Sequence, residues 1–396
     1  MTNTKLKQLA KKYGTPVYIY NQEVIEKQFS KLDKSIKYSP KQIYYAAKAN
    51  SNIHILKLMR RLGASLDTSS PGEIFLGLEA GFKPKQILFT GNNLADSELK
   101  FALNKGIFIN ADSLSQLEKI GKMAPGSNVG VRINPSFGAG YHDHVITAGP
   151  ACRFGIYYKE VDKVKEIAEK YDLKITGIHQ HIGSGVLHSS KLLRAAGILL
   201  STAKEFEHLE FVDFGGGLGV PYKPSEKELD VKSFGKDMAI KFEKFSQEYG
   251  KDIEMCFEPG RFLVAEAGTL LARVTTVKSM PNGNKVIGIN SGMTHLIRPA
   301  LYNSYHEIEN LSNPGGKKEK VDVVGFICES TDSFAKRREI AKVREGDILA
   351  IRNAGAYGMS MASRFNGRLL PAEVLVKGDR SRIIRKPDKF NDLLPK

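Results

Sequence analysis

The chain has 396 residues, more than one compact core usually holds, and 41% hydrophobic with 26% charged residues is the composition of a soluble globular protein. The formal net charge is +16, but no basic face is interleaved with aromatic residues, which argues against a nucleic-acid partner. No apolar run approaches the ~20 residues that span a bilayer, and three scattered cysteines without metal spacing indicate a reducing compartment. We therefore expect a cytoplasmic protein of two domains, with no membrane or nucleic-acid partner.

In the first two thirds of the chain, short β-rich runs alternate with helical patterns. Between the runs, apolar residues recur at i, i+3 and i+4, as in 52–63 and 159–171. Eight strands alternating with helices are typical of a TIM-type (β/α)8 barrel, for which ~250 residues is the usual size. We assign this α/β barrel to residues 24–270. The expected strands are 42–48, 65–70, 87–90, 107–110, 129–135, 175–182, 211–217 and 254–260.

After about residue 270, strand-like runs follow one another without long helices between them. This pattern predicts a second, β-rich domain of sandwich or barrel-like type over residues 271–396. The opening stretch "TPVYIYN" (15–21) also reads as a strand. Because the strand count of the barrel is already complete, we assign residues 1–23 to the β-rich domain.

Polar residues and glycines gather at the carboxyl ends of the expected barrel strands. In a (β/α)8 barrel, that face holds the active site whatever the chemistry. The positions concerned are Lys48, Asp67, Asn110, Asn134, His181, the glycines 215–217 and Glu258.

Lys48 follows an apolar, β-favouring run with two alanines, in "IYYAAKANSN" (43–52). The alanines indicate that something packs closely there, and a lysine beside them is costly unless it is paired, exposed or neutralised. Three interpretations are open: a structural ion pair, a cation that binds substrate, and an amine that forms an imine. Taken alone, the ion pair is the commonest.

The segment "DFGGGLG" (213–219) has four glycines in five positions after an expected strand. Such a loop lets backbone N–H groups approach an anion, and a (β/α)8 barrel habitually binds phosphate after its seventh strand. The alternative is a tight strand-to-helix turn. A Rossmann dinucleotide site is disfavoured, because valine at position 220 breaks the G-x-G-x-x-G spacing.

Two further strand ends carry ionisable groups. In "FEPGRF" (257–262), the Glu258 carboxylate could pair with a protonated ring nitrogen, while Arg261 could hold phosphate or carboxylate. In "HQHIGSG" (179–185), alternation puts His179 and His181 on one face, which allows a metal. No third and fourth ligand are evident at matching strand ends, so we expect no metal and a histidine ring stacked on a flat cofactor.

These features together indicate a site for pyridoxal 5'-phosphate: an inward lysine, a glycine-rich loop for the phosphate, a carboxylate and a flat ring. In this interpretation Lys48 forms the imine, and the carboxylate keeps the pyridine nitrogen protonated so that the ring accepts electrons. The cost of placing a lysine beside the alanines is then avoided, because the amine of Lys48 is bound covalently to the cofactor and is not a free ammonium group.

Six motifs in fixed order resemble the fold-type III pyridoxal-phosphate amino-acid decarboxylases: "YYAAKAN", "HQHIGSG", "DFGGGLGVPY", "EPGRF", "CES" (328–330) and "NAGAYGMSMASRFNGR" (353–368). The similarity runs over nearly the whole chain. It implies that Lys48 is the imine lysine, that His181 stacks on the cofactor ring and that Glu258 contacts the pyridine nitrogen. The cofactor contacts expected overall are Lys48, Asp67, His181, Ser184, Gly217, Glu258, Pro259, Gly260, Arg261 and Tyr357.

The resemblance also implies roles for the β-rich domain. Cys328 would donate the proton that quenches the carbanion after CO2 leaves; the alternative is a small buried hydrophobe, which the adjacent Glu329 disfavours. Members of the family are homodimers with shared active sites, in which "CES" reaches into the barrel of the neighbouring subunit. The implied substrate contacts are Arg261, Arg298, Tyr302, Glu329 and Tyr357.

The expected substrate is an amino acid with two charged ends. Relatives that act on ornithine or arginine need only neutralise a distal cation, whereas Glu329 and Arg298 together suit a distal amine and a distal carboxylate. We therefore expect decarboxylation of meso-2,6-diaminopimelate to L-lysine, the last step of lysine biosynthesis. The alternatives are a decarboxylase of another basic amino acid, a metal-dependent barrel hydrolase, and a non-catalytic cofactor carrier, which Cys328 and Glu329 disfavour.

Overall fold

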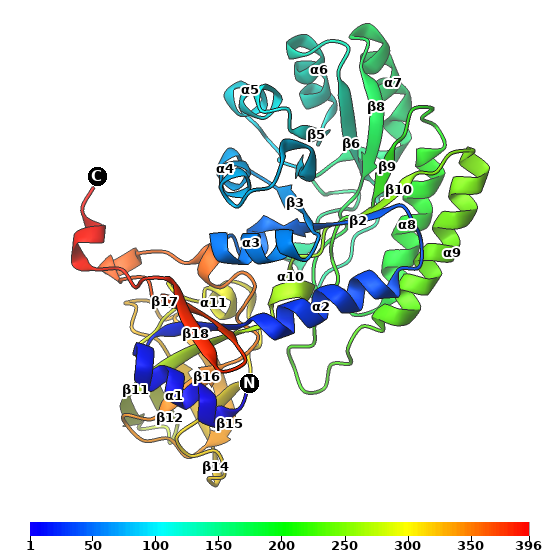
Figure 1. The fold of residues 1–396 in the computed structure, drawn as a ribbon. Helices are drawn as coiled ribbons and strands as arrows, with labels where there is room; N and C mark the ends of the chain where they lie inside the picture. The colour runs from blue at the N-terminus through cyan, green and yellow to red at the C-terminus, as the bar shows by residue number, and fades with distance from the viewer. Residues whose placement is uncertain (396) are drawn as a thin grey trace. The chain divides into compact units, whose positions relative to one another are not determined.

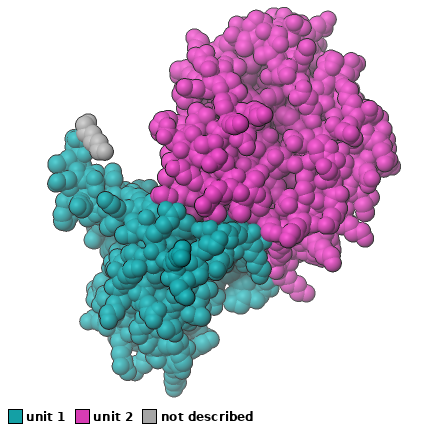
Figure 2. Space-filling model, viewed as in Figure 1, with its two compact units in different colours: residues 1–27, 221–226, 263–396 teal, residues 28–220, 227–262 magenta. Residues whose placement is uncertain are grey.

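The computed structural model describes residues 1–395 (Figure 1). Contacts within the chain divide it into two compact units, which Figure 2 shows in different colours. The short segment 221–226 groups with unit 1 of Figure 2, although in the sequence it lies between two segments of unit 2. The units are the barrel unit, residues 28–220 and 227–262, and the sheet unit, residues 1–27, 221–226 and 263 onward.

The barrel unit is built on parallel strands. They are β2 (Lys41–Ala46), β3 (Ser65–Thr68), β4 (Ile87–Phe89), β5 (Phe108–Ala111), β6 (Asn128–Asn134), β7 (Ile156–Tyr157), β8 (Lys174–His179), β9 (Phe211–Asp213) and β10 (Glu254–Phe257). Eight of them pair in the order β5-β4-β3-β2-β10-β9-β8-β6, and the pairing of β6 with β5 closes the ring, while the short β7 pairs with β6. The predicted (β/α)8 barrel is confirmed.

Helices surround the barrel strands (Figure 1). They are α2 (Gln22–Ser35), α3 (Ile53–Arg61), α4 (Pro71–Glu79), α5 (Asp96–Asn104), α6 (Leu114–Met123), α7 (Val161–Lys170), α8 (Ser189–Ala203), α9 (Val231–Tyr249) and the short α10 (Arg261–Val264). Side-chain caps fix several starts: Ser70 and Ser113 accept hydrogen bonds from the first turns of α4 and α6, and Asp230 from that of α9. No described helix is long and apolar enough to cross a membrane.

The sheet unit contains one mixed sheet and two helices. Its elements are α1 (Asn3–Tyr13), β1 (Val17–Asn21), β11 (Gly268–Ser279), β12 (Lys285–Ile289), α11 (Arg298–Tyr302), β13 (Ile308–Asn310), β14 (Lys318–Val324), β15 (Ser333–Ala341), β16 (Ile348–Ile351), β17 (Ala372–Lys377) and β18 (Arg380–Arg385). Strand β1 pairs antiparallel with β11 and parallel with β17. The N-terminal strand therefore belongs to this sheet.

Several strands end earlier than the sequence pattern suggests. Strand β9 stops at Asp213, because Gly215 and Gly217 take left-handed conformations with φ of +66° and +95°. Strand β8 likewise ends at His179, and β10 ends at Phe257, two residues before Pro259. Lys48, His181 and Glu258 thus lie on short loops just beyond the strands, whereas Asp67 lies on β3 itself.

Candidate active site

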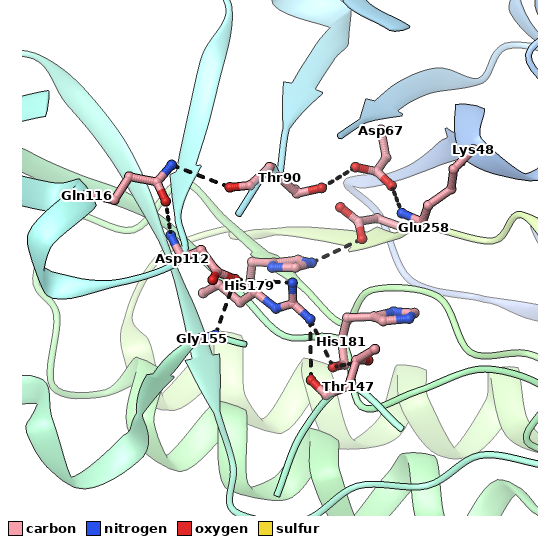
Figure 3. A network of polar contacts seen from close by, with 12 residues as sticks. Lys48, Asp67, Thr90, Asp112, Gln116, Thr147, Gly155, His179, His181 and Glu258 are labelled. Atoms are coloured by element: carbon pink, nitrogen blue, oxygen red, sulfur yellow. Dashed lines mark hydrogen bonds and ion pairs between the residues drawn. The ribbon is translucent and has the colours of Figure 1, made fainter. Parts of the chain in front are cut away.

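Lys48 and Asp67 form an ion pair at the carboxyl ends of two neighbouring strands. Lys48 lies in a single 3₁₀ turn directly after β2, and Asp67 lies on β3, paired with Ala46. Nζ of Lys48 donates to Oδ2 of Asp67 at 2.7 Å (Figure 3). The Asp67 side chain is fully buried, whereas that of Lys48 is 38% exposed. The ion-pair interpretation therefore describes this structure, and part of the Lys48 side chain is exposed.

The environment makes Asp67 a good proton acceptor. Burial raises the pKa of Asp67, and the Glu258 carboxylate raises it further, against the opposing effect of Lys48. Thr90, at the end of β4, donates its hydroxyl to the other carboxylate oxygen of Asp67. A proton released from Nζ of Lys48 has an acceptor that is fixed in place.

The alanines beside Lys48 make room for Gly260. A Cβ atom on Gly260 would lie 2.9 Å from the Cβ of Ala49 and 3.1 Å from that of Ala46. The backbone N–H of Ala46 also donates to the Pro259 carbonyl at 3.4 Å. Small residues on both sides therefore bring the turn after β10 against the turn that carries Lys48.

Glu258 is an ionised carboxylate in a buried position. Its Oε2 lies 3.0 Å from Nε2 of His179, while Oε1 is buried without a hydrogen-bond partner among the described residues. Burial acts to raise the pKa of Glu258, but His179 and Lys48 lower it by more, to about 2. The carboxylate thus has one oxygen held by the protein and one oxygen able to accept a further hydrogen bond.

His181 is a neutral imidazole with a fixed tautomer. Its Nδ1 accepts a hydrogen bond from the backbone N–H of Gly216 at 3.1 Å, so the ring proton is on Nε2. Burial, with Lys48 and Arg132 nearby, lowers its pKa well below the usual value. The carbonyl of His181 accepts from Thr147 Oγ1 at 3.0 Å and from Arg132 at 3.4 Å. Hydrogen bonds therefore hold both the ring nitrogen and the backbone carbonyl of His181. Figure 3 shows those of the carbonyl.

The glycine-rich loop packs too closely for any side chain. A Cβ on Gly215 would lie 2.1 Å from the Gln180 carbonyl oxygen, and one on Gly216 would lie 2.3 Å from that of Glu258. The packing of "DFGGGLG" is therefore that of a tight strand-to-helix turn. Phosphate binding by the same backbone is compatible with this geometry and stays a prediction.

Ser184 and Arg261 lie together next to this loop. The Ser184 hydroxyl accepts hydrogen bonds from Nε and Nη2 of Arg261 at 3.1 and 3.0 Å. Arg261 is buried, and its guanidinium lies 4.9 Å from the centre of the Tyr141 ring. Two of the expected cofactor contacts are thus brought to one place by α10 and the loop after β8.

The sequence interpretation missed Asp213. Ligand-capable atoms of His179, Asp213 and Glu258 lie within 4.8 Å of one another, so two carboxyl groups accompany His179, one of the two histidines. Burial and the neighbouring Glu258 raise the pKa of Asp213 well above the usual value. The two histidines also have different partners, since Nδ1 of His181 is bonded to Gly216. Asp213 ends β9, so the strand-end rule could have found it.

The "CES" motif lies in an exposed loop of the sheet unit, between β14 and β15. Cys328 is exposed, which excludes its interpretation as a buried hydrophobe. Glu329 is exposed too and lies inside the loop, because β14 stops at Val324. The Asp332 carboxylate fixes the loop by accepting from the backbone N–H of Ile327 at 2.7 Å.

The other expected substrate contacts lie on two further segments of the sheet unit. Arg298 begins α11 and is 1% exposed, and Tyr302 ends the same helix. Tyr357 follows β16 and has a φ of +56°, an uncommon conformation for a tyrosine that is often associated with functional sites.

Comparison with known proteins decides the family. Residues 22–265 match the family described as "Pyridoxal-dependent decarboxylase, pyridoxal binding domain". A diaminopimelate decarboxylase from Methanothermobacter thermautotrophicus is 42% identical over 98% of this chain and 92% of its own. The chain belongs to the diaminopimelate decarboxylase family.

Other relatives extend the same likeness over the full length. The diaminopimelate decarboxylase of Escherichia coli K12 is 34% identical and matches all of this chain and 96% of its own. The crystal structure of the Helicobacter pylori diaminopimelate decarboxylase complexed with L-lysine superposes with a TM-score of 0.90, at 33% identity over 98% of both chains. Both units of the present fold are therefore those of the diaminopimelate decarboxylase family.

The residues at the barrel mouth fit pyridoxal 5'-phosphate, the cofactor of this family. The decisive atom is Oε1 of Glu258, a buried carboxylate oxygen without a partner in the described chain. A protonated ring nitrogen is a donor that would satisfy it. Lys48 and the neutral His181 accompany Glu258 here (Figure 3), so the amine, ring and carboxylate that the cofactor requires occur together.

Proposed function

We propose that this protein decarboxylates meso-2,6-diaminopimelate to L-lysine. The observation that carries the proposal is the group formed by Lys48, Asp67, His181 and Glu258, which fits pyridoxal phosphate. The substrate is supported by the full-length relatives named diaminopimelate decarboxylase and by the H. pylori relative complexed with L-lysine.

In this proposal, each residue of the barrel has a separate task. Bound pyridoxal phosphate supplies an electron sink for the electron pair left when CO2 departs. Lys48 binds the cofactor covalently through Nζ, and Asp67 takes up or returns the proton of that amine. Glu258 keeps a proton at the ring nitrogen, and His181 covers one face of the ring. Ser184, Gly217, Gly260 and Arg261, beside Pro259, would hold the phosphate, and Tyr357 of the sheet unit is the remaining expected cofactor contact.

The sheet unit is proposed to recognise the substrate. Arg298 pairs with the distal carboxylate and Glu329 with the distal amine, while Tyr302 and Tyr357 contact the remainder of the substrate. Arg261, a residue of the barrel unit, is the fifth expected substrate contact. A site that pairs both groups rejects amino acids lacking one of them, because its own charged groups are then left without partners.

A direct assay tests this function. The purified protein, supplied with pyridoxal phosphate, is expected to release CO2 and L-lysine in equal amounts from meso-diaminopimelate. L-Lysine and L-ornithine, which as substrates lack a distal carboxylate, should be decarboxylated hardly at all. Equal kcat/KM values on L-ornithine or L-lysine would refute the substrate assignment and point to a broader basic amino-acid decarboxylase.

We further propose that the protein is a homodimer in which the "CES" loop of one subunit acts in the barrel of the other. The exposure of Cys328 and Glu329 on a loop fixed by Asp332 supports this arrangement. The unpaired cysteines are compatible with a cytoplasmic location, which we propose as well.

Cys328→Ala is expected to slow turnover by about 10²–10⁴-fold, the usual worth of a positioned general acid, because the thiol donates the proton to the carbon that lost CO2. Cofactor binding should be unchanged. The measurement is kcat on meso-diaminopimelate, with Cys152→Ala as the matched control. Unchanged turnover in Cys328→Ala would remove the thiol from the mechanism.

Mixing this variant with inactive Lys48→Ala protein should restore part of the activity through hybrid dimers.

A further inference from the structure

We propose that His306 is a positioning residue that sets substrate specificity, by holding the guanidinium of Arg298 in the orientation that binds a carboxylate. The inference rests on the proposed function, because it takes Arg298 as the group that recognises the distal carboxylate of the substrate. The residues that carry it all belong to the sheet unit.

Arg298 is anchored by its helix and by neutral acceptors. It is the first residue of α11 and is 1% exposed. Its Nη1 lies 2.9 Å from Nε2 of His306, and its Nη2 lies 3.4 Å from the Ser304 hydroxyl. Because a guanidinium only donates, the His306 nitrogen must accept.

The protonation state of His306 follows from its second contact. Its Nδ1 lies 2.8 Å from the carbonyl oxygen of Arg352, a group that only accepts, so Nδ1 carries the proton. Nε2 then has the lone pair that accepts from Arg298. His306 is fully buried, and both of its nitrogens have defined roles.

The sheet itself fixes His306. The backbone N–H of Arg352 donates to the Glu307 carbonyl at 2.9 Å, which continues the pairing of β13 with β16 (Ile308 with Ile351). The residue whose carbonyl orients the imidazole is therefore itself held by a backbone hydrogen bond that continues the strand pairing. A chain of hydrogen bonds runs from the backbone of Arg352, directly after β16, through His306 to the guanidinium of Arg298.

Tyr222 supports the same guanidinium from a second direction. The Cζ atom of Arg298 lies 4.5 Å from the centre of the Tyr222 ring, and that ring meets His306 edge to face at 5.4 Å. The preceding Pro221 carbonyl accepts from Asn353 Nδ2 at 3.0 Å. These contacts explain why the segment 221–226 groups with the sheet unit.

Fixing the arginine before the substrate arrives should improve recognition of a carboxylate. A free arginine loses much side-chain entropy on binding, and two parallel hydrogen bonds to a carboxylate require a fixed plane. His306 and Tyr222 restrict that plane in the free protein. Loss of the acceptor at Nε2 should therefore weaken carboxylate binding without removing the charge of Arg298.

Two substitutions of His306 separate its two hydrogen bonds. In His306→Asn, the amide nitrogen replaces Nδ1 and keeps the bond to Arg352, but the acceptor at the position of Nε2 is lost. In His306→Gln, the side-chain oxygen replaces Nε2 and can still accept from Arg298. The matched control is His208→Asn, at an exposed histidine after α8.

The readout is the inhibition of the cofactor-loaded enzyme by L-lysine and by cadaverine. L-Lysine has one carboxylate, and cadaverine is the same molecule without it. L-Lysine is the product, and its carboxylate is the one that is distal to the reacting carbon in the substrate. The ratio of their inhibition constants therefore measures carboxylate recognition. We expect His306→Asn to lower this preference about 10–100-fold, the worth of one hydrogen bond to a charged group. His306→Gln and His208→Asn should stay within about threefold of the wild type.

Arg298→Ala and Tyr222→Leu complete the test. If Arg298→Ala abolishes the preference but His306→Asn and Tyr222→Leu both keep it, the inference is overturned while the proposed function stands. If Arg298→Ala itself keeps the preference, the assignment of Arg298 in the proposed function is wrong. Tyr222→Leu should lower the preference about 2–30-fold through the lost ring contact, and it serves as the deciding variant if His306→Asn does not fold.

Discussion

Lys48→Ala is expected to lower turnover of meso-diaminopimelate by at least about 10⁴-fold and to leave no cofactor covalently bound. The effect should be large because the proposal gives one atom, Nζ of Lys48, two tasks: it attaches the cofactor, and it exchanges a proton with Asp67, whose Oδ2 lies 2.7 Å away. The measurements are kcat with saturating substrate and cofactor, and the visible absorbance that remains with the protein after borohydride reduction and gel filtration.

The matched control for this prediction is Lys57→Ala, at an exposed lysine on α3. Its turnover and its bound absorbance should equal those of the wild type. Covalent trapping of cofactor by Lys48→Ala would mean that another lysine carries the cofactor, and the assignment of the site would then be wrong.

The ratio of kcat/KM for meso-diaminopimelate to kcat/KM for L-lysine measures the substrate preference. Arg298→Ala is expected to lower this ratio by up to about 10⁴-fold. A site built for a buried carboxylate discriminates by this amount, because its charged group is left unsatisfied when the substrate lacks the partner. As a substrate, L-lysine places its only carboxylate at the reacting carbon. The variant should therefore lose most activity on diaminopimelate and proportionately less on L-lysine.

Two controls distinguish a specific change in substrate preference from a loss of folding. Arg380→Ala, at an exposed arginine of β18, should keep the wild-type preference. Thermal unfolding of Arg298→Ala should reveal whether the buried side chain also stabilises the sheet unit. An unchanged preference in a folded Arg298→Ala protein would show that another group reads the distal carboxylate.

The barrel could be predicted from the sequence because its signals are local. Eight β-rich runs alternate with amphipathic helices, and the strand-end rule then brings Lys48, Asp67 and Glu258 to one face. The same rule, applied further, would have added Thr90 and Asp213. Strand lengths were overestimated where glycines follow, since apolar patterning continues past the residue at which left-handed φ angles end the pairing.

Other features depend on contacts that no local pattern encodes. His179 and His181 are two residues apart, yet one bonds Glu258 and the other a glycine N–H, because the strand ends between them. The contact of Tyr222 with Arg298 joins segments some 76 positions apart in the sequence (298 minus 222). Nothing in the residues around Tyr222 indicates this partner.

The most direct test of the account is to identify the lysine that carries the cofactor. The wild-type protein, loaded with pyridoxal phosphate, is reduced with borohydride, digested and analysed by mass spectrometry. We predict that the added mass of the reduced cofactor will be found on the peptide containing Lys48, in an amount approaching one per chain. Modification of a different lysine, or no modification of a protein that still decarboxylates diaminopimelate, would contradict the account.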